Sequence, residues 1–144
     1  MIFVISLSIL FLDQFSKIIV SKNLSLNQSV PLIRGVFHLT LIHNRGAAFG
    51  MLRNQAQLFI LTTVLAIIFI LITLKKNKGK KRPIYNISLS CILGGALGNF
   101  IDRLTSGYVI DFLDFRIWPV FNVADSAITV GAILLGWALL KTKN

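Results

Sequence analysis

The acidic residues of this chain are few and of a single type. All five are aspartates, and there is no glutamate: Asp13, Asp102, Asp111, Asp114 and Asp125. Four of the five fall between positions 102 and 125, beside strongly apolar segments. Carboxylates at the border of apolar helices are costly, which makes them candidates for function. Two carboxylates held close together share one proton, and such a pair can activate water and polarise a carbonyl, as in aspartic proteases.

Asp111 and Asp125 are separated by 14 positions with Pro119 between them, so they cannot share one helix face. A loop that folds back could still bring the two carboxylates together. The spacing alone leaves an alternative open, in which both are helix caps or ion-pair partners of Arg103 and Arg116. Asp114 is the main rival to Asp111, and we expect it to be a loop residue.

The elements that must position these aspartates are membrane spans. The chain has 144 residues, of which 55% are hydrophobic and 14% charged, whereas a soluble domain carries about 25% charged residues. The mean hydropathy is +0.77. We therefore expect a single all-α membrane domain over residues 1–144. Its four spans, each near the 20 or so residues that cross a bilayer, are expected at about 2–20, 57–74, 84–101 and 123–140.

The charge distribution predicts how the spans are oriented. The formal net charge is +10, and six of the eight residues in 75–82 are basic. A cationic stretch between two apolar segments is typical of a cytoplasmic loop rather than of a nucleic-acid surface. Lys141 and Lys143 follow the last span and belong on the same side. Both termini are then expected in the cytoplasm, with segments 21–56 and 102–122 outside.

Segment 21–56 shows a weak strand signal. Apolar and polar residues alternate around Phe37, Leu39 and Leu41. We expect a small extracytoplasmic strand pair there. A metal site is not indicated, because the two histidines and the single cysteine, Cys91, show no ligand spacing.

Longer motifs surround the aspartates. They occur in five ordered blocks, LDQFSK at 12–17, HNRGAAFG at 43–50, GGALGNFIDR at 94–103, GYVIDF at 107–112 and FNVADSAITVG at 121–131. On these blocks the sequence resembles the bacterial lipoprotein signal peptidases, also called signal peptidase II. The resemblance covers nearly the whole chain.

This resemblance implies both a fold and an activity. The fold is four transmembrane helices with a small extracytoplasmic β-cradle and a short periplasmic helix. The activity is removal of signal peptides from diacylglyceryl-modified prolipoproteins, with cleavage just before the lipidated cysteine. Asp111 and Asp125 are the catalytic dyad by the family's pattern, and no metal or organic cofactor is implied. Globomycin-type cyclic peptides are implied as inhibitors that occupy the dyad.

Supporting residues are expected around the dyad. Asp13 and Lys17 are spaced i, i+4 and can pair on one helix face. Asn44 is a candidate for contact with substrate or for fixing the strand cradle. Asn122 lies three residues before Asp125, where its amide could orient a carboxylate or bind substrate.

A polar group also ends the third span. It consists of Asn99, Asp102 and Arg103, and we expect Arg103 to pair with Asp102 as a buried support or to contact substrate.

Two other classes of protein compete with a protease. A small four-helix transporter would use Asp13 inside the membrane to bind protons or cations, although Lys17 is a ready partner for it. A structural or assembly protein would have no use for paired aspartates, and their substitution would then be harmless.

Overall fold

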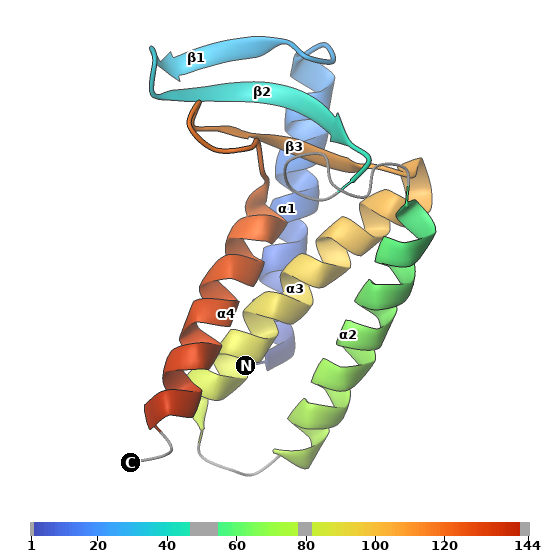
Figure 1. The fold of residues 1–144 in the computed structure, drawn as a ribbon, viewed down its shortest axis with the longest axis vertical. Coiled ribbons are helices and arrows are strands. Elements are labelled where there is room, and N and C mark those ends of the chain that lie inside the picture. Colours follow the sequence, from blue (N-terminus) through green and yellow to red (C-terminus); the bar gives the residue numbers. More distant parts are fainter. Residues whose placement is uncertain (1, 47–54, 78–81, 142–144) are drawn as a thin grey trace.

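Four long helices form a bundle with a small sheet at one end (Figure 1). The computed structural model describes residues 2–46, 55–77 and 82–141. All four helices are long and apolar enough to cross a membrane, which confirms the four expected spans. The elements are α1 (Ile2–Asn23), β1 (Ser29–Ile33), β2 (Phe37–Asn44), α2 (Ala56–Lys76), α3 (Pro83–Ser106), β3 (Val109–Asp114) and α4 (Val123–Lys141).

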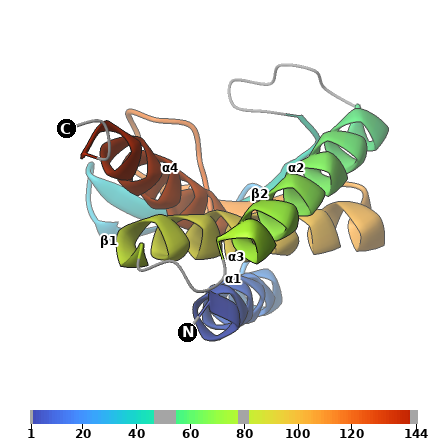
Figure 2. The ribbon, with the colours of Figure 1, turned by 90° about the horizontal axis from the view of Figure 1, so that it is seen from below.

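Helix α3 is the centre of the bundle and contacts the other three helices (Figure 2). Glycines on α3 allow this close packing. A Cβ atom on Gly95 would collide with the carbonyl oxygen of Ala124 on α4, and one on Gly94 would lie 2.7 Å from the carbonyl oxygen of Ser6 on α1. Small residues at such contacts let the helix backbones approach closely in a membrane.

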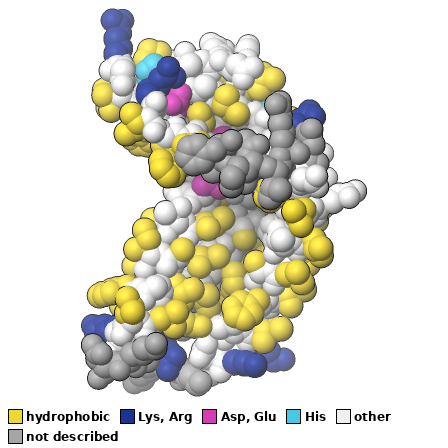
Figure 3. All heavy atoms as spheres, in the orientation of Figure 1, with side chains coloured by type: hydrophobic (Ala, Val, Ile, Leu, Met, Phe, Trp, Pro, Cys, Tyr) yellow, Lys and Arg dark blue, Asp and Glu magenta, His cyan; other side chains and the backbone are white. Residues whose placement is uncertain are grey.

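The bundle surface is apolar, as a surface facing hydrocarbon must be. Hydrophobic side chains cover the helices in the space-filling view, and Lys and Arg lie at the two ends of the molecule (Figure 3). Phe3 and Phe11 on α1 and Phe69 on α2 are all exposed. Part of the interior is apolar as well, where one buried cluster joins Ile70 of α2 to Leu93 of α3.

The sheet has three antiparallel strands in the order β1-β2-β3. The strand pair expected in segment 21–56 is therefore confirmed as β1 and β2. The third strand, β3, comes from the segment after the third span, where no strand was expected. A second cluster, Val20 of α1 with Leu41 of β2 and Phe112 of β3, packs the sheet onto the bundle.

The position at which α3 ends matters for the site. Helix α3 continues beyond its expected end to Ser106, so Asp102 and Arg103 lie on the helix. Gly107 then adopts a left-handed conformation with φ +75°, which favours glycine and ends the helix. The chain can therefore turn directly into β3.

A short additional helix is not seen among the described residues. Residues 47–54, which include part of the 43–50 block, lie outside them.

Candidate active site

Asp111 is placed by the sheet. It lies in β3 opposite Ile42 of β2, and Asn44 lies opposite Val109. The Asn44 amide donates to Oδ2 of Asp111 at 2.8 Å, while Oδ1 of Asn44 accepts the backbone N–H of Gly46 at 2.9 Å. This second bond fixes the amide so that its N–H faces the carboxylate.

Asp125 is placed by the first turn of α4. Its Oδ1 accepts a hydrogen bond from Nδ2 of Asn99 on α3 at 2.7 Å. Its Oδ2 accepts the backbone N–H of Asn122 at 3.3 Å. Negative charge is favoured here because the N-terminus of a helix carries a partial positive charge.

Asn122 joins the two aspartates. Its Nδ2 donates to Oδ1 of Asp111 at 2.7 Å, and its backbone N–H reaches Asp125. The side chain is fully buried. The structure therefore brings together Asp111 and Asp125, as the sequence analysis expected, and gives Asn44, Asn99 and Asn122 direct contacts with the pair.

The environment of Asp111 favours its neutral form. Burial raises its pKa, the nearby charge of Asp125 raises it further, and the amides of Asn44 and Asn122 and the charge of Lys17 lower it. The result is a pKa of about 7, against an ordinary 3.8. A carboxyl group that titrates near neutral pH can either give or take a proton there.

A buried charged cluster lies behind the pair. The ammonium of Lys17 is 2.7 Å from Asp13 and 2.8 Å from Asp102. Asp13 also accepts the backbone N–H of Ala124, at the start of α4, at 2.9 Å. The expected pairing of Asp13 with Lys17 is confirmed. Asp13 also caps a second helix, so hydrogen bonds and an ion pair account for its presence inside the bundle.

The expected pairing of Arg103 with Asp102 is wrong. Lys17 is the cation that contacts Asp102, and the Arg103 guanidinium lies over the ring of Phe59 on α2, 4.8 Å from its centroid. Consecutive helix residues point about 100° apart. Asp102 therefore faces α1, whereas Arg103 faces α2.

Gln14 is a member of this cluster that sequence reasoning missed. Its amide donates to Asp102 at 2.9 Å and to the carbonyl oxygen of Gly98 at 3.2 Å. The available signal was a polar amide inside an apolar span, next to Asp13.

Asp114 lies away from the pair. It is the last residue of β3 rather than a loop residue, which corrects the expectation. Its Oδ2 accepts hydrogen bonds from Thr40 at 2.7 Å and from Arg116 at 3.0 Å. Arg116 therefore forms an ion pair with Asp114.

A cavity of about 360 Å³ opens over the two aspartates. Asp111 and Asp125 line it together with Asn44, Asn99 and Arg103. An apolar pocket of about 530 Å³ shares four lining residues with it, Trp118, Phe121, Asp125 and Thr129, and is also lined by side chains such as Phe115 and Val130. The pair therefore lies where a polar chain and an apolar group could be bound side by side. The part of the chain that the structure describes holds no cluster of three His, Cys, Asp or Glu side chains that could bind a metal.

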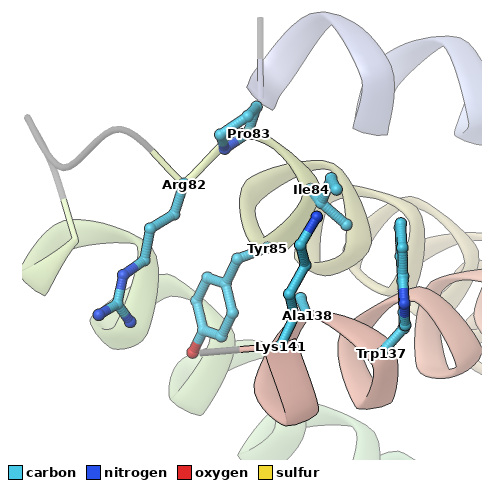
Figure 4. Close-up of a pocket in the computed structure, with 7 residues that line it drawn as sticks. All are labelled: Arg82, Pro83, Ile84, Tyr85, Trp137, Ala138 and Lys141. Atoms are coloured by element: carbon cyan, nitrogen blue, oxygen red, sulfur yellow. The ribbon is translucent and has the colours of Figure 1, made fainter. Parts of the chain in front are cut away.

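Another cavity, of about 320 Å³, lies at the opposite end of the bundle, between the start of α3 and the end of α4 (Figure 4). Arg82, Tyr85, Trp137 and Lys141 line it. None of its described lining residues is acidic, and none contacts the aspartate pair. The catalytic candidates therefore belong to the cavity at the sheet end.

Comparison with known proteins agrees with this geometry. Residues 5–141 match the profile of a family described as Signal peptidase (SPase) II. A lipoprotein signal peptidase of Moorella thermoacetica is 52% identical over 136 residues, covering 94% of this chain and 90% of that protein. One of Halothermothrix orenii is 49% identical over 135 residues, covering 94% and 92%.

Solved structures are similar as well. A bacterial membrane enzyme determined by the in meso method at 2.3 Å superposes with a TM-score of 0.88 at 32% identity, covering 98% of this chain and 88% of that one. Another, at 1.9 Å, gives a TM-score of 0.84 at 33% identity, covering 96% and 91%.

Proposed function

Because the chain belongs to the signal peptidase II family, and so is an aspartic peptidase that cleaves prolipoprotein signal peptides, we propose that Asp111 and Asp125 are its catalytic pair. The observation that carries the proposal is their joint attachment to Asn122, at the floor of one cavity. A pair in this position can hold one proton between them near neutral pH.

The reaction needs one ionised and one protonated carboxyl. The ionised partner takes a proton from a water molecule, whose oxygen attacks the scissile carbonyl carbon. The protonated partner donates its proton to the carbonyl oxygen, which gives a tetrahedral diol. The carboxyl that took the water proton then gives it to the peptide nitrogen, while the other carboxylate takes a proton from one hydroxyl of the diol. The C–N bond breaks, which leaves a carboxyl group on one product and a free amino terminus on the other. The pair ends the cycle with one proton, as it began.

The substrate in this proposal is a diacylglyceryl-modified prolipoprotein cut just before its lipidated cysteine. The cavity over the pair would hold the extended peptide, with Arg103 and Asn44 within reach of its backbone. The adjoining apolar pocket, beside Asp125 and Val130, would receive hydrocarbon. Globomycin-type peptides would compete for the same cavity.

The proposed location is the bacterial inner membrane with both termini in the cytoplasm. Lys75 and Lys76 end α2, Arg82 precedes α3 and Lys141 ends α4. These cations therefore lie at the end of the bundle opposite the sheet (Figure 1) and support this orientation. The sheet and the aspartate pair would then face the extracytoplasmic side, where signal peptides emerge.

The test is cleavage by the purified protein in lipid or detergent. A diacylglyceryl prolipoprotein is the substrate, and the same precursor without lipid is its matched control. We expect a product that begins at the modified cysteine, identified by mass spectrometry, and its loss with globomycin or in Asp111→Asn and Asp125→Asn. Equal cleavage of the unmodified precursor would contradict the proposed substrate. Substantial cleavage by either variant would contradict the proposed pair.

A further inference from the structure

Lys17 occupies an unusual position for a lysine. Its side chain is 2% exposed, and its ammonium contacts Oδ2 of Asp13 at 2.7 Å, Oδ2 of Asp102 at 2.8 Å and Oδ1 of Asn99 at 3.1 Å. An ammonium has three N–H donors and no acceptor. The three contacts therefore use all of its hydrogen-bonding capacity and hold it in one place.

The ammonium determines which way the Asn99 amide faces. Because Lys17 can only donate, Asn99 must present its oxygen to it. Nδ2 of Asn99 is then turned away, toward Oδ1 of Asp125, to which it donates at 2.7 Å. A rotated amide would place two donors against each other at Lys17 and an oxygen against the Asp125 carboxylate.

Asn122 extends the same constraint to Asp111. Its Nδ2 donates to the Asn99 oxygen at 3.1 Å and to Oδ1 of Asp111 at 2.7 Å. Its own oxygen accepts the backbone N–H of Asp125 at 2.8 Å. A cation behind the pair thus fixes two amides so that both carboxylates meet N–H groups.

We propose that Lys17 is a positioning residue for the aspartate pair, acting through the amide orientations of Asn99 and Asn122. The proposal rests on the proposed function of Asp111 and Asp125. N–H donors favour the ionised form of a carboxyl group, so the two amides oppose the effect of burial and keep one carboxylate of the pair available as a base.

Other charges around the pair bear on this role. Asp13 on α1 and Asp102 on α3 offset the charge of Lys17, and Arg103 on α3 lies on the cavity side of the pair. The Lys17 charge itself lowers the pKa of Asp111, against burial and Asp125, which raise it. Loss of Lys17 therefore acts on the pair in one direction, toward the protonated form.

The test variant must keep the charge of the buried cluster. Lys17→Met alone would leave Asp13 and Asp102 buried without a counter-ion, which is strongly destabilising. The double variant Lys17→Met/Asp13→Asn removes one charge of each sign, and Asp102 keeps its hydrogen bonds from the Gln14 amide and from the backbone N–H of Ile110. An asparagine at position 13 can still accept the backbone N–H of Ala124. Lys22→Met, in the exposed last turn of the same helix, is the matched control.

The readouts are kcat, KM and the pH dependence of prolipoprotein cleavage. We expect the double variant to lose about 10²-fold in kcat, the effect of a small misplacement of reacting groups, with KM little changed. Because Asp13→Asn offsets the lost Lys17 charge, the alkaline limb of its pH profile should move to higher pH through the loss of the oriented amide N–H donors. Asn99→Leu should lose a similar factor, and the two changes combined should lose no more than either does, because they interrupt one path. Lys22→Met should match the unaltered protein.

Three results would overturn the proposal. The first is a double variant whose kcat and alkaline pH limb are both unchanged. The second is a combination of the double variant with Asn99→Leu in which the two losses of kcat multiply. The third is failure of the double variant to fold, because Lys17 would then serve the fold itself. The experiment requires two controls: the unaltered protein must be active, and Asp111→Asn and Asp125→Asn must both be inactive. An inactive unaltered protein, or an active aspartate variant, would refute the proposed function and this proposal with it.

Discussion

Asn122 and Asp125 cap the N-terminus of α4 by hydrogen bonds in both directions. Oδ1 of Asn122 accepts the backbone N–H of Asp125 at 2.8 Å, and Oδ2 of Asp125 accepts the backbone N–H of Asn122 at 3.3 Å. This is a capping box, with Asn122 before the first helical residue and Asp125 at the third. Asp125 therefore serves as a helix cap with one oxygen and faces Asn99 with the other. The cap and the proposed catalytic role do not compete.

This relationship predicts that two substitutions of Asp125 separate activity from stability. Asp125→Asn keeps an oxygen that can accept the Asn122 N–H, while its NH2 group then meets Nδ2 of Asn99, so it should keep the cap and lose cleavage. Asp125→Ala removes the cap as well, which costs about 1 kcal/mol. Thermal unfolding in detergent, measured beside the cleavage assay, checks both. Equal stability of the two variants would show that the capping bond contributes little.

The raised pKa of Asp111 predicts the alkaline limb of the pH profile. As pH rises through about 7, the pair loses its last proton and can no longer protonate the carbonyl oxygen, so kcat should fall. The Asn44 amide lowers this pKa by stabilising the ionised form. A hydrogen bond to a charged group is worth about 1.5–3 kcal/mol, so Asn44→Leu should move the limb upward by about 1–2 pH units.

Cleavage rates between pH 5 and 10 test this shift. The matched control is Asn23→Leu, since Asn23 is exposed and its amide donates to the carbonyl oxygen of Ile19 one turn earlier on its own helix. A limb that stays in place in Asn44→Leu would mean that another group sets it.

Substitution of Asp114 tests whether Asp111, rather than Asp114, is the catalytic partner of Asp125. Burial alone would raise its pKa, but hydrogen bonds from Thr40 and Arg116 outweigh this and lower it below the ordinary 3.8. Asp114→Asn should leave kcat within about twofold and cost about 1 kcal/mol of stability. Because the lowered pKa stabilises the fold only while the carboxyl is ionised, this difference should shrink as pH falls below about 4. An inactive but folded Asp114→Asn would show that Asp111 is the wrong choice.

The sequence made the spans predictable, because each is a long apolar run that needs no tertiary information. It also made the Asp13–Lys17 pair predictable, since i, i+4 neighbours meet on any helix. The partner of Asp102 was not predictable in this way. It depends on how far α3 is rotated about its axis, which is set by the packing of α3 against α1 and α2.

The strand that carries Asp111 was also missed. β3 pairs with β2, more than sixty positions earlier in the chain, and its residues 109–114 include two aspartates that interrupt the apolar pattern. Long-range pairing supplies its strand character. The resemblance identified Asp111 without this information, whereas the contacts of Asn44 and Asn122 required the three-dimensional structure.

The close contact between α3 and α4 gives a final prediction, for a residue that touches neither aspartate. A Cβ on Gly95 would collide with the carbonyl oxygen of Ala124, the residue before Asp125. Gly95→Ala should therefore push the start of α4 away from Asn99 and lower kcat by about 10²-fold, with a loss of about 1–3 kcal/mol from overpacking. Gly136→Ala is the control, because no contact within 4 Å of its Cβ position is seen among the described residues, and it should leave cleavage unchanged. If Gly95→Ala retained full activity, the distance between α3 and α4 would not control the position of Asp125.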